Sequence, residues 1–188
     1  MKIHQYMKTH RNKLILTAFI LQILMLLSVI ALVYGVSRKG QAVILEMTGY
    51  DPYDALRGRY LQMDNPADDV ILEPGSLERY TGKNKENVPV YVILEENPEN
   101  GLSAFSYASL DRPEDTVPYI RCGSRYLRTY EDESRIRILP RINQYYLNEK
   151  SAERLDQSVQ WDTEIHTSLK IWHGLYVVDG IEIDGQRY

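Results

Sequence analysis

The residues whose types and spacing could do chemistry gather in the segment Gly49–Tyr60, which reads GYDPYDALRGRY. Asp51 and Asp54 bring two carboxylates within a few positions of the Arg57 guanidinium. A guanidinium can bind a carboxylate through two parallel hydrogen bonds. Because proline fixes φ and the glycine that follows Arg57 permits a positive φ, the segment is expected to form a turn that leads into a strand.

Two interpretations of this segment remain open. In the first, Arg57 pairs with Asp51 or Asp54 only to hold a rigid turn. In the second, the segment is a recognition surface for a ligand or a partner. The candidate binding residues are then Asp51, Asp54, Arg57, Tyr60 and Glu149.

An enzyme is the alternative function. Asp51 and Glu149 could support glycoside hydrolysis if folding brought their carboxyl groups within about 5–9.5 Å of each other. A serine peptidase that uses a serine directly after an N-terminal membrane helix is disfavoured, because no serine occurs between Gly40 and Tyr60. The alternative is therefore an envelope hydrolase that acts on peptide or glycan through the carboxylates of the Asp51–Tyr60 segment, and no catalytic residue is assigned.

Metal or cofactor chemistry is not expected. Beyond the N-terminal region the only histidines are His166 and His173, which are seven residues apart. If one continuous strand held both, they would point to opposite faces. The sequence predicts neither a metal site nor a cofactor.

The segment resembles the start of the GDYXXLXYXF family of membrane-anchored bacterial proteins. The positions that carry this resemblance are Asp51, Pro52, Asp54, Arg57, Gly58 and Tyr60. Two later stretches match as well: Gln144–Glu149 with Ser151–Leu155, and Gly174–Gly185.

The chain also departs from the family pattern. Arg59 stands where the family has an aspartate, and the later Leu, Tyr and Phe positions are Met63, Asn65 and Ala67. A reaction that relied on that aspartate would not be open to this chain. Since members of the family tend to be encoded beside multi-spanning membrane proteins, the resemblance implies a location and a neighbour rather than a reaction.

An apolar helix must hold this segment near a membrane. The 23 residues of Leu14–Val36 contain no charge and only four polar interruptions. As a helix they measure about 34 Å, enough to cross a hydrocarbon core of about 30 Å. The run is apolar on every side, whereas a buried helix of a soluble domain would show a polar stripe. The sequence predicts a single transmembrane anchor in the lipid bilayer.

The flanking charges predict which side the domain occupies. Lys2, Lys8, Arg11 and Lys13 precede the apolar run, and only Arg38 and Lys39 follow it. Positive residues are retained on the cytoplasmic side, so residues 1–13 are expected to form a cytoplasmic tail and residues 40–188 an extracytoplasmic domain of the cell membrane. A cleaved signal peptide is the rival interpretation, but its apolar region would be about 7–15 residues long.

The composition of residues 40–188 excludes some partners. The region carries 26 acidic residues against 16 lysines and arginines, a net charge of −10. That sign argues against nucleic acid and against adhesion to anionic lipid headgroups. With one cysteine, Cys122, the chain cannot form an intramolecular disulfide, so an apolar core must supply its stability.

The fold class predicted for this region is mostly β: one curled sheet or barrel-like domain with a short helix. Short β-branched or alternating runs are separated by Gly, Pro, Asn and Asp clusters, which is typical of many strands. We expect strands at 42–47, 58–63, 88–95, 104–110, 117–121, 135–139, 164–172 and 175–183, and a helix at 149–157. A tight turn is expected at 97–101, and Asp179-Gly180 is expected to form a turn or a bulge.

The function expected from these features is an accessory or binding protein that partners a multi-spanning membrane protein. The chain has a single anchor, no credible catalytic set and 15 tyrosines against two phenylalanines and two tryptophans. Tyrosine supplies rigid contact area with a polar tip, which suits interfaces. It also fills half-buried strand positions, and that explanation covers most of these tyrosines.

Overall fold

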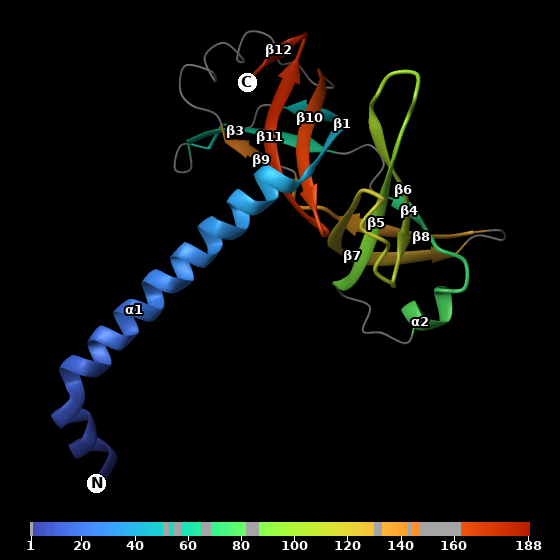
Figure 1. Cartoon of the computed structure of the whole chain (residues 1–188). Coiled ribbons are helices and arrows are strands. Elements are labelled where there is room, and N and C mark those ends of the chain that lie inside the picture. The colour runs from blue at the N-terminus through green and yellow to red at the C-terminus, as the bar shows by residue number, and fades with distance from the viewer. Residues whose placement is uncertain are drawn as a thin grey trace.

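The computed structural model describes residues 2–50, 53–54, 58–64, 69–81, 87–129, 133–142, 144–146 and 163–188. The helix predicted at 149–157 lies outside these residues. Within them the fold is mostly β: one long N-terminal helix, two β units that share a core, and one short helix (Figure 1).

Helix α1 (Lys2–Lys39) contains the whole predicted apolar run and projects away from the β strands, with the N-terminus at its far end (Figure 1). Its large apolar side chains are exposed from Leu14 to Val33, so they contact little of the described chain. A helix that packed inside a soluble domain would bury one face of this run. The chain therefore carries a helix that is long and apolar enough to cross a membrane.

An antiparallel sheet follows α1 directly. Its strands run in the order β12-β11-β10-β1-β3-β9, and β2 pairs with β3. The strands are β1 (Gln41–Tyr50), β2 (Tyr53–Asp54), β3 (Gly58–Asp64), β9 (Gln144–Tyr146), β10 (Thr163–Trp172), β11 (Leu175–Ile183) and β12 (Gln186–Arg187).

The central pair of this sheet shows why the alternating sequence forms it. Val43 lies opposite Leu169 and Met47 opposite Ile165, and all four side chains are buried on one face. Successive side chains of a strand point to opposite faces, so a shift of one residue would turn this whole set towards water. The burial of one face of 164–172, predicted from its alternation, is confirmed.

Five further strands close into a barrel. Each pairs with two neighbours, in the cyclic order β5-β6-β4-β8-β7, and only the β4–β6 pair is parallel. Closure gives each of the five strands a neighbour on both sides, which reduces the strand edge available to other chains. The strands are β4 (Asp69–Leu72), β5 (Val88–Glu96), β6 (Ser103–Ser109), β7 (Tyr119–Thr129) and β8 (Ser134–Leu139).

A buried tyrosine on the short helix α2 (Leu77–Thr81) closes off part of the barrel interior. Tyr80 is 2% exposed, and its hydroxyl lies 3.1 Å from Ser124 Oγ. Ser124 in turn donates to the Val88 carbonyl at 2.9 Å. Because the serine hydrogen goes to that carbonyl, the Tyr80 hydroxyl is the donor to Ser124.

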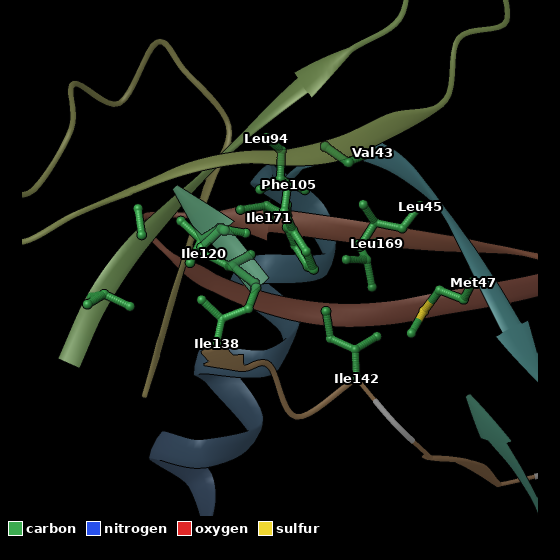
Figure 2. Packing of buried hydrophobic residues seen from close by; sticks show 14 of the residues in the cluster. Val43, Leu45, Met47, Leu94, Phe105, Ile120, Ile138, Ile142, Leu169 and Ile171 are labelled. Atoms are coloured by element: carbon green, nitrogen blue, oxygen red, sulfur yellow. The ribbon is translucent and has the colours of Figure 1, made fainter. Parts of the chain in front are cut away.

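The sheet and the barrel share one hydrophobic core. Figure 2 shows Val43, Leu45 and Met47 of β1 facing Phe105, Ile120 and Ile138 of the barrel strands. Backbone contacts link the two units as well: Leu45 pairs with Ser103, and the Arg121 N–H donates to the Gly174 carbonyl at 2.9 Å. The two β units are therefore packed as one body.

Most predicted elements are confirmed, and the differences have local causes. Strands β2, β4, β9 and β12 and helix α2 were not among the predicted elements; each is two to five residues long, too short for a clear periodic pattern. β7 extends to Thr129, beyond the predicted 117–121. Asp179 is a bulge, because Ser168 pairs with Gly180 while Leu169 pairs with Val178.

The two tight turns of the C-terminal strands have the same geometry. His173 and Gly174 have φ of 50° and 78°, and Asp184 and Gly185 have φ of 50° and 75°. Positive φ at both central residues defines the type I′ turn, which matches the twist of a two-residue hairpin. His173 thus lies in a turn rather than in a strand that also holds His166.

Candidate functional site

Only the backbone of two predicted site residues lies within the described structure. Asp54 pairs with Gly58 in the short β2–β3 ribbon, and Tyr60 pairs with Tyr146 of β9. Asp51, Arg57 and Glu149 lie outside the described residues. β3 confirms the predicted strand, residues 55–57 of the predicted turn lie outside the described residues, and the two interpretations of the segment both stand as predictions.

The stretches that carry the family resemblance are connected, although β9 and β11 lie near opposite ends of the sheet. β3 and β9 pair through Tyr60 with Tyr146 and Leu61 with Tyr145. The Tyr145 hydroxyl donates to the Tyr188 carbonyl at 3.3 Å, and Tyr188 exchanges backbone hydrogen bonds with Ile181 of β11. Segments far apart in the sequence therefore form one continuous structural unit.

A cavity of about 550 Å³ opens where the barrel meets the sheet. Volumes of this order are typical of small-molecule sites. Strands of both units contribute to it. The lining residues are Met47, Met63, Asp64, Asn87, Pro89, Arg121, Cys122, Gly123, Arg125, Ile138, Leu139, Pro140, Arg141, Ile142 and Tyr176.

The cavity has an apolar floor and a basic rim. Met47, Met63, Ile138 and Ile142 are at most 2% exposed and belong to the core beneath it. Arg121, Arg125 and Arg141 are exposed side chains, and among the described residues that line the cavity the one carboxylate is that of Asp64. The arrangement suits a molecule with an apolar body and a negatively charged end.

Two further polar groups lie in the wall of the cavity. The Tyr176 hydroxyl accepts the Arg141 backbone N–H at 2.9 Å, and burial raises the pKa of this phenol above its usual value. The phenol therefore stays neutral and can donate its proton to a bound acceptor. Cys122, the one cysteine of the chain, is half-buried in the same wall.

Gly123, at the rim of the cavity, leaves room for the side chain of Asn87. A Cβ built on Gly123 would overlap the side-chain oxygen of Asn87, which packs over this position. Asn87 itself has a φ of 60°, a conformation that asparagine tolerates better than most residues. The end of β5 and the middle of β7 thus approach closely beside the cavity.

The C-terminal end of α1 packs tightly on the β10–β11 hairpin. Val36 is 1% exposed, and the Lys39 ammonium lies 5.3 Å from the centre of the Trp172 ring. A Cβ on Gly40 would overlap the Val36 carbonyl oxygen and come within 3.0 Å of the Ile171 nitrogen. The helix is therefore held against the β domain by close packing as well as by the chain connection.

A charged cluster lies beside this junction. Asp115 Oδ1 accepts hydrogen bonds from Arg112 Nη2 at 2.8 Å and from the Tyr119 hydroxyl at 3.0 Å, and lies 2.9 Å from His173 Nδ1. Hydrogen bonds from Arg112 and then His173 lower the pKa of Asp115 to about 2. Desolvation is the main cause that raises the pKa of Tyr119. The cluster ties the loop before β7 to the β10–β11 turn.

Sequence reasoning did not find the basic cavity. Arg121 and Arg125 are on β7 and Arg141 follows β8, so their positions gave no local motif. The alternation of Arg121, Gly123 and Arg125 was the available signal, since strand geometry places all three on one face. The sequence does not show that β7 pairs with β8, so it could not be inferred that Arg141 lies near Arg121 and Arg125.

No curated protein and no solved structure shows significant similarity to the chain. The sequence model of one family, described as GDYXXLXY protein, matches residues 22–181. This match begins inside α1 and extends to β11, and it includes the β2–β3 ribbon, β9 and the cavity. The chain belongs to the GDYXXLXY protein family.

Proposed function

We propose that this protein is a membrane-anchored accessory protein whose β domain works on the extracytoplasmic face, docked on a multi-spanning membrane protein. The observation that carries the proposal is the combination of α1 with its tight junction. The large apolar side chains of α1 are exposed from Leu14 to Val33. The last turn of the helix packs on Trp172. A domain held in this way has a fixed orientation on the membrane surface.

The charge and surface of the domain support the same function. Positive residues before the apolar run keep the N-terminus in the cytoplasm. The net negative charge of the domain opposes adhesion of its surface as a whole to anionic headgroups, so its sides can be presented to another protein. Val117 and Leu175, which are 40% and 42% exposed, lie near the junction and offer apolar contact area there. The family resemblance supplies the class of partner.

Topology is the first test. Protease is added to intact spheroplasts that carry an N-terminal epitope tag. We expect loss of the β domain and survival of a short tagged membrane fragment. Protection of the domain would reverse the orientation, and release of the domain without protease would indicate cleavage.

Site-specific photocrosslinking tests the partner. A photoreactive phenylalanine analogue replaces Leu24 on the exposed face of α1, or Leu175 beside the junction. In the matched control the photoreactive residue replaces Tyr126, which lies on β7 and is 68% exposed. We expect Leu24 and Leu175 to capture the same multi-spanning protein, identified by mass spectrometry, and Tyr126 not to. Adducts with lipid alone at both positions would contradict the accessory function.

A further inference from the structure

The arginines around the cavity differ from five other arginines among the described residues of the β domain. In the described residues five arginines each form an ion pair with a carboxylate: Arg79, Arg112, Arg128, Arg135 and Arg187. Within the same part of the chain Arg121, Arg125 and Arg141 form no ion pair. Among the described residues, three arginines without an ion pair to another described residue thus gather around one cavity.

This concentration is unusual in a domain with a net charge of −10. Acidic residues outnumber basic ones, so a random surface arginine is expected to find a carboxylate nearby. Three guanidinium groups around one opening repel each other and attract an anion into it. Arginine is also the side chain whose geometry best matches a carboxylate or a phosphate.

The apolar part of the lining sets a second requirement. Pro89, Leu139 and Pro140 line the cavity and are not fully buried, so a small hydrated ion would leave their apolar surface in water. An apolar group of the ligand would remove this surface from water. The neutral Tyr176 hydroxyl adds a hydrogen-bond donor beside the arginines.

We propose that this cavity binds an amphipathic organic anion: its carboxylate or phosphate contacts Arg121, Arg125 and Arg141, and its apolar body lies against Pro89, Leu139 and Pro140. The site does not depend on membrane topology or on a protein partner, so it extends the accessory function rather than restating it. The anion comes either from solution or from the end of a membrane lipid, and both share this chemistry.

The experiment uses the full chain in phosphatidylcholine nanodiscs, with 4-phenylbutyrate as the soluble probe and 4-phenylbutanamide as its uncharged counterpart. Binding is measured by isothermal titration calorimetry against empty nanodiscs. We expect 4-phenylbutyrate to bind and the amide and inorganic phosphate to bind at least about tenfold more weakly, because each lacks one of the two required features. Equal binding of the acid and the amide, or no binding of the acid, would overturn the proposal.

Variants locate the site. Arg121→Gln, Arg125→Gln and Arg141→Gln are each expected to weaken 4-phenylbutyrate binding by about tenfold, the usual loss for one charge-assisted hydrogen bond. Arg128→Gln is the matched control, since it removes the same charge from the same strand but the side chain pairs with Asp69 outside the cavity. An equal loss in Arg128→Gln would show that only net charge matters and would overturn a defined site.

Cys122 provides an independent readout, because it is the one thiol of the chain and lies in the cavity wall. Bound 4-phenylbutyrate is expected to slow alkylation of Cys122 by iodoacetamide, and the amide is not. Binding that leaves this rate unchanged would place the probe elsewhere. Nanodiscs that contain phosphatidylglycerol distinguish the source: protection of Cys122 without added probe indicates a lipid, and no protection indicates a soluble anion.

Discussion

Gly174 lies directly against the ring of Tyr119: a Cβ at this glycine would come within 2.8 Å of Tyr119 Cε2 and 3.3 Å of Arg121 Cβ. The same residue has a φ of 78° and accepts the Arg121 backbone hydrogen bond. One glycine therefore joins the β10–β11 turn to the barrel, beside both the Asp115 cluster and the end of α1. Its replacement has two separable effects.

Gly174→Ala should destabilise the protein more than Gly185→Ala. Both glycines occupy the second position of a type I′ turn, with φ of 78° and 75°, but nothing lies within 4 Å of a Cβ at Gly185. Each substitution costs about 1–2 kcal/mol for the left-handed conformation. Gly174→Ala adds about 1–3 kcal/mol for overpacking against Tyr119. Urea unfolding of the two variants measures the difference, and equal losses would contradict the packing argument.

Asp115 should make the stability of the protein sensitive to acid. Its pKa is lowered from 3.8 to about 2 by Arg112 and then His173, so the stabilisation is complete above about pH 4 and is lost as the pH falls through about 2. Asp115→Asn should flatten the fall of the melting temperature across this interval. Asp179→Asn, which removes a carboxylate paired with Arg187, is the matched control. Identical pH profiles of wild type and Asp115→Asn would refute this assignment.

At the junction of α1 with the sheet, Gly35→Ala should leave stability almost unchanged and Gly40→Ala should lower it. A Cβ at Gly35 would lie 3.4 Å from Trp172 Cζ3, an ordinary contact, whereas a Cβ at Gly40 would overlap the backbone of α1 and approach that of β10. Gly35→Ala is expected to be neutral or stabilising by about 0.5–1 kcal/mol. Gly40→Ala is expected to cost about 1–3 kcal/mol.

The two junction variants are compared by thermal unfolding and by limited proteolysis between α1 and β1. Faster cleavage at the junction should accompany Gly40→Ala alone. If both variants cleave like the wild type, the helix is connected to the sheet less tightly than its packing indicates.

Some of these relationships could be read from sequence and others could not. The alternation in 164–172 predicted β10, because one face of a strand must be apolar when one face of the sheet is buried. The length and uniform apolarity of Leu14–Val36 predicted that part of α1 in the same way. Both predictions rest on patterns within one continuous segment, alternation in β10 and unbroken apolarity in α1, and such local patterns are preserved in the fold.

The cavity and the junction rest on pairing between distant segments instead. Arg141 reaches the arginines of β7 only because Gly123 pairs with Leu139 in the β7–β8 register. Trp172 meets the end of α1 only because Gln41 pairs with Ile171. The sequence of one segment does not show which distant segment pairs with it. These parts of the candidate site could therefore be found only from the structure.

Removal of the Ser124 hydroxyl should destabilise the protein more than removal of the Tyr80 hydroxyl with which it is paired. Ser124→Ala leaves the Tyr80 hydroxyl buried without its acceptor, which costs about 1–3 kcal/mol. Tyr80→Phe removes the donor, while Ser124 keeps its bond to the Val88 carbonyl, so the loss should be smaller, about 0.5–1.5 kcal/mol. In the Tyr80→Phe background Ser124→Ala should cost less than it does alone. Additive losses in the double variant would mean that the two hydroxyls do not interact.

The Asp51–Tyr60 segment gives different outcomes for its structural and functional interpretations. If Arg57 pairs with Asp51 or Asp54 only to hold the turn, Arg57→Ala lowers stability, by about 1 kcal/mol for an exposed pair and about 3–5 kcal/mol for a buried one. Any loss of partner crosslinking then follows the loss of folded protein. If the segment is a recognition surface, Arg57→Ala and Tyr60→Ala abolish crosslinking while the melting temperature barely changes.

The pairing of β3 supplies the control for this last experiment. In the backbone pairing Arg59 lies opposite Tyr53 and Tyr60 opposite Tyr146. Because successive residues of a strand alternate between its two faces, we expect substitutions at positions 59 and 60 to affect opposite faces. A one-faced site therefore predicts that Tyr60→Ala removes crosslinking from Leu175 and that Arg59→Ala does not. Equal loss in both variants would argue against a one-faced site. Unchanged crosslinking in Arg57→Ala, Arg59→Ala and Tyr60→Ala would exclude the segment as the interface and leave the surface beside Trp172 as the place where the partner docks.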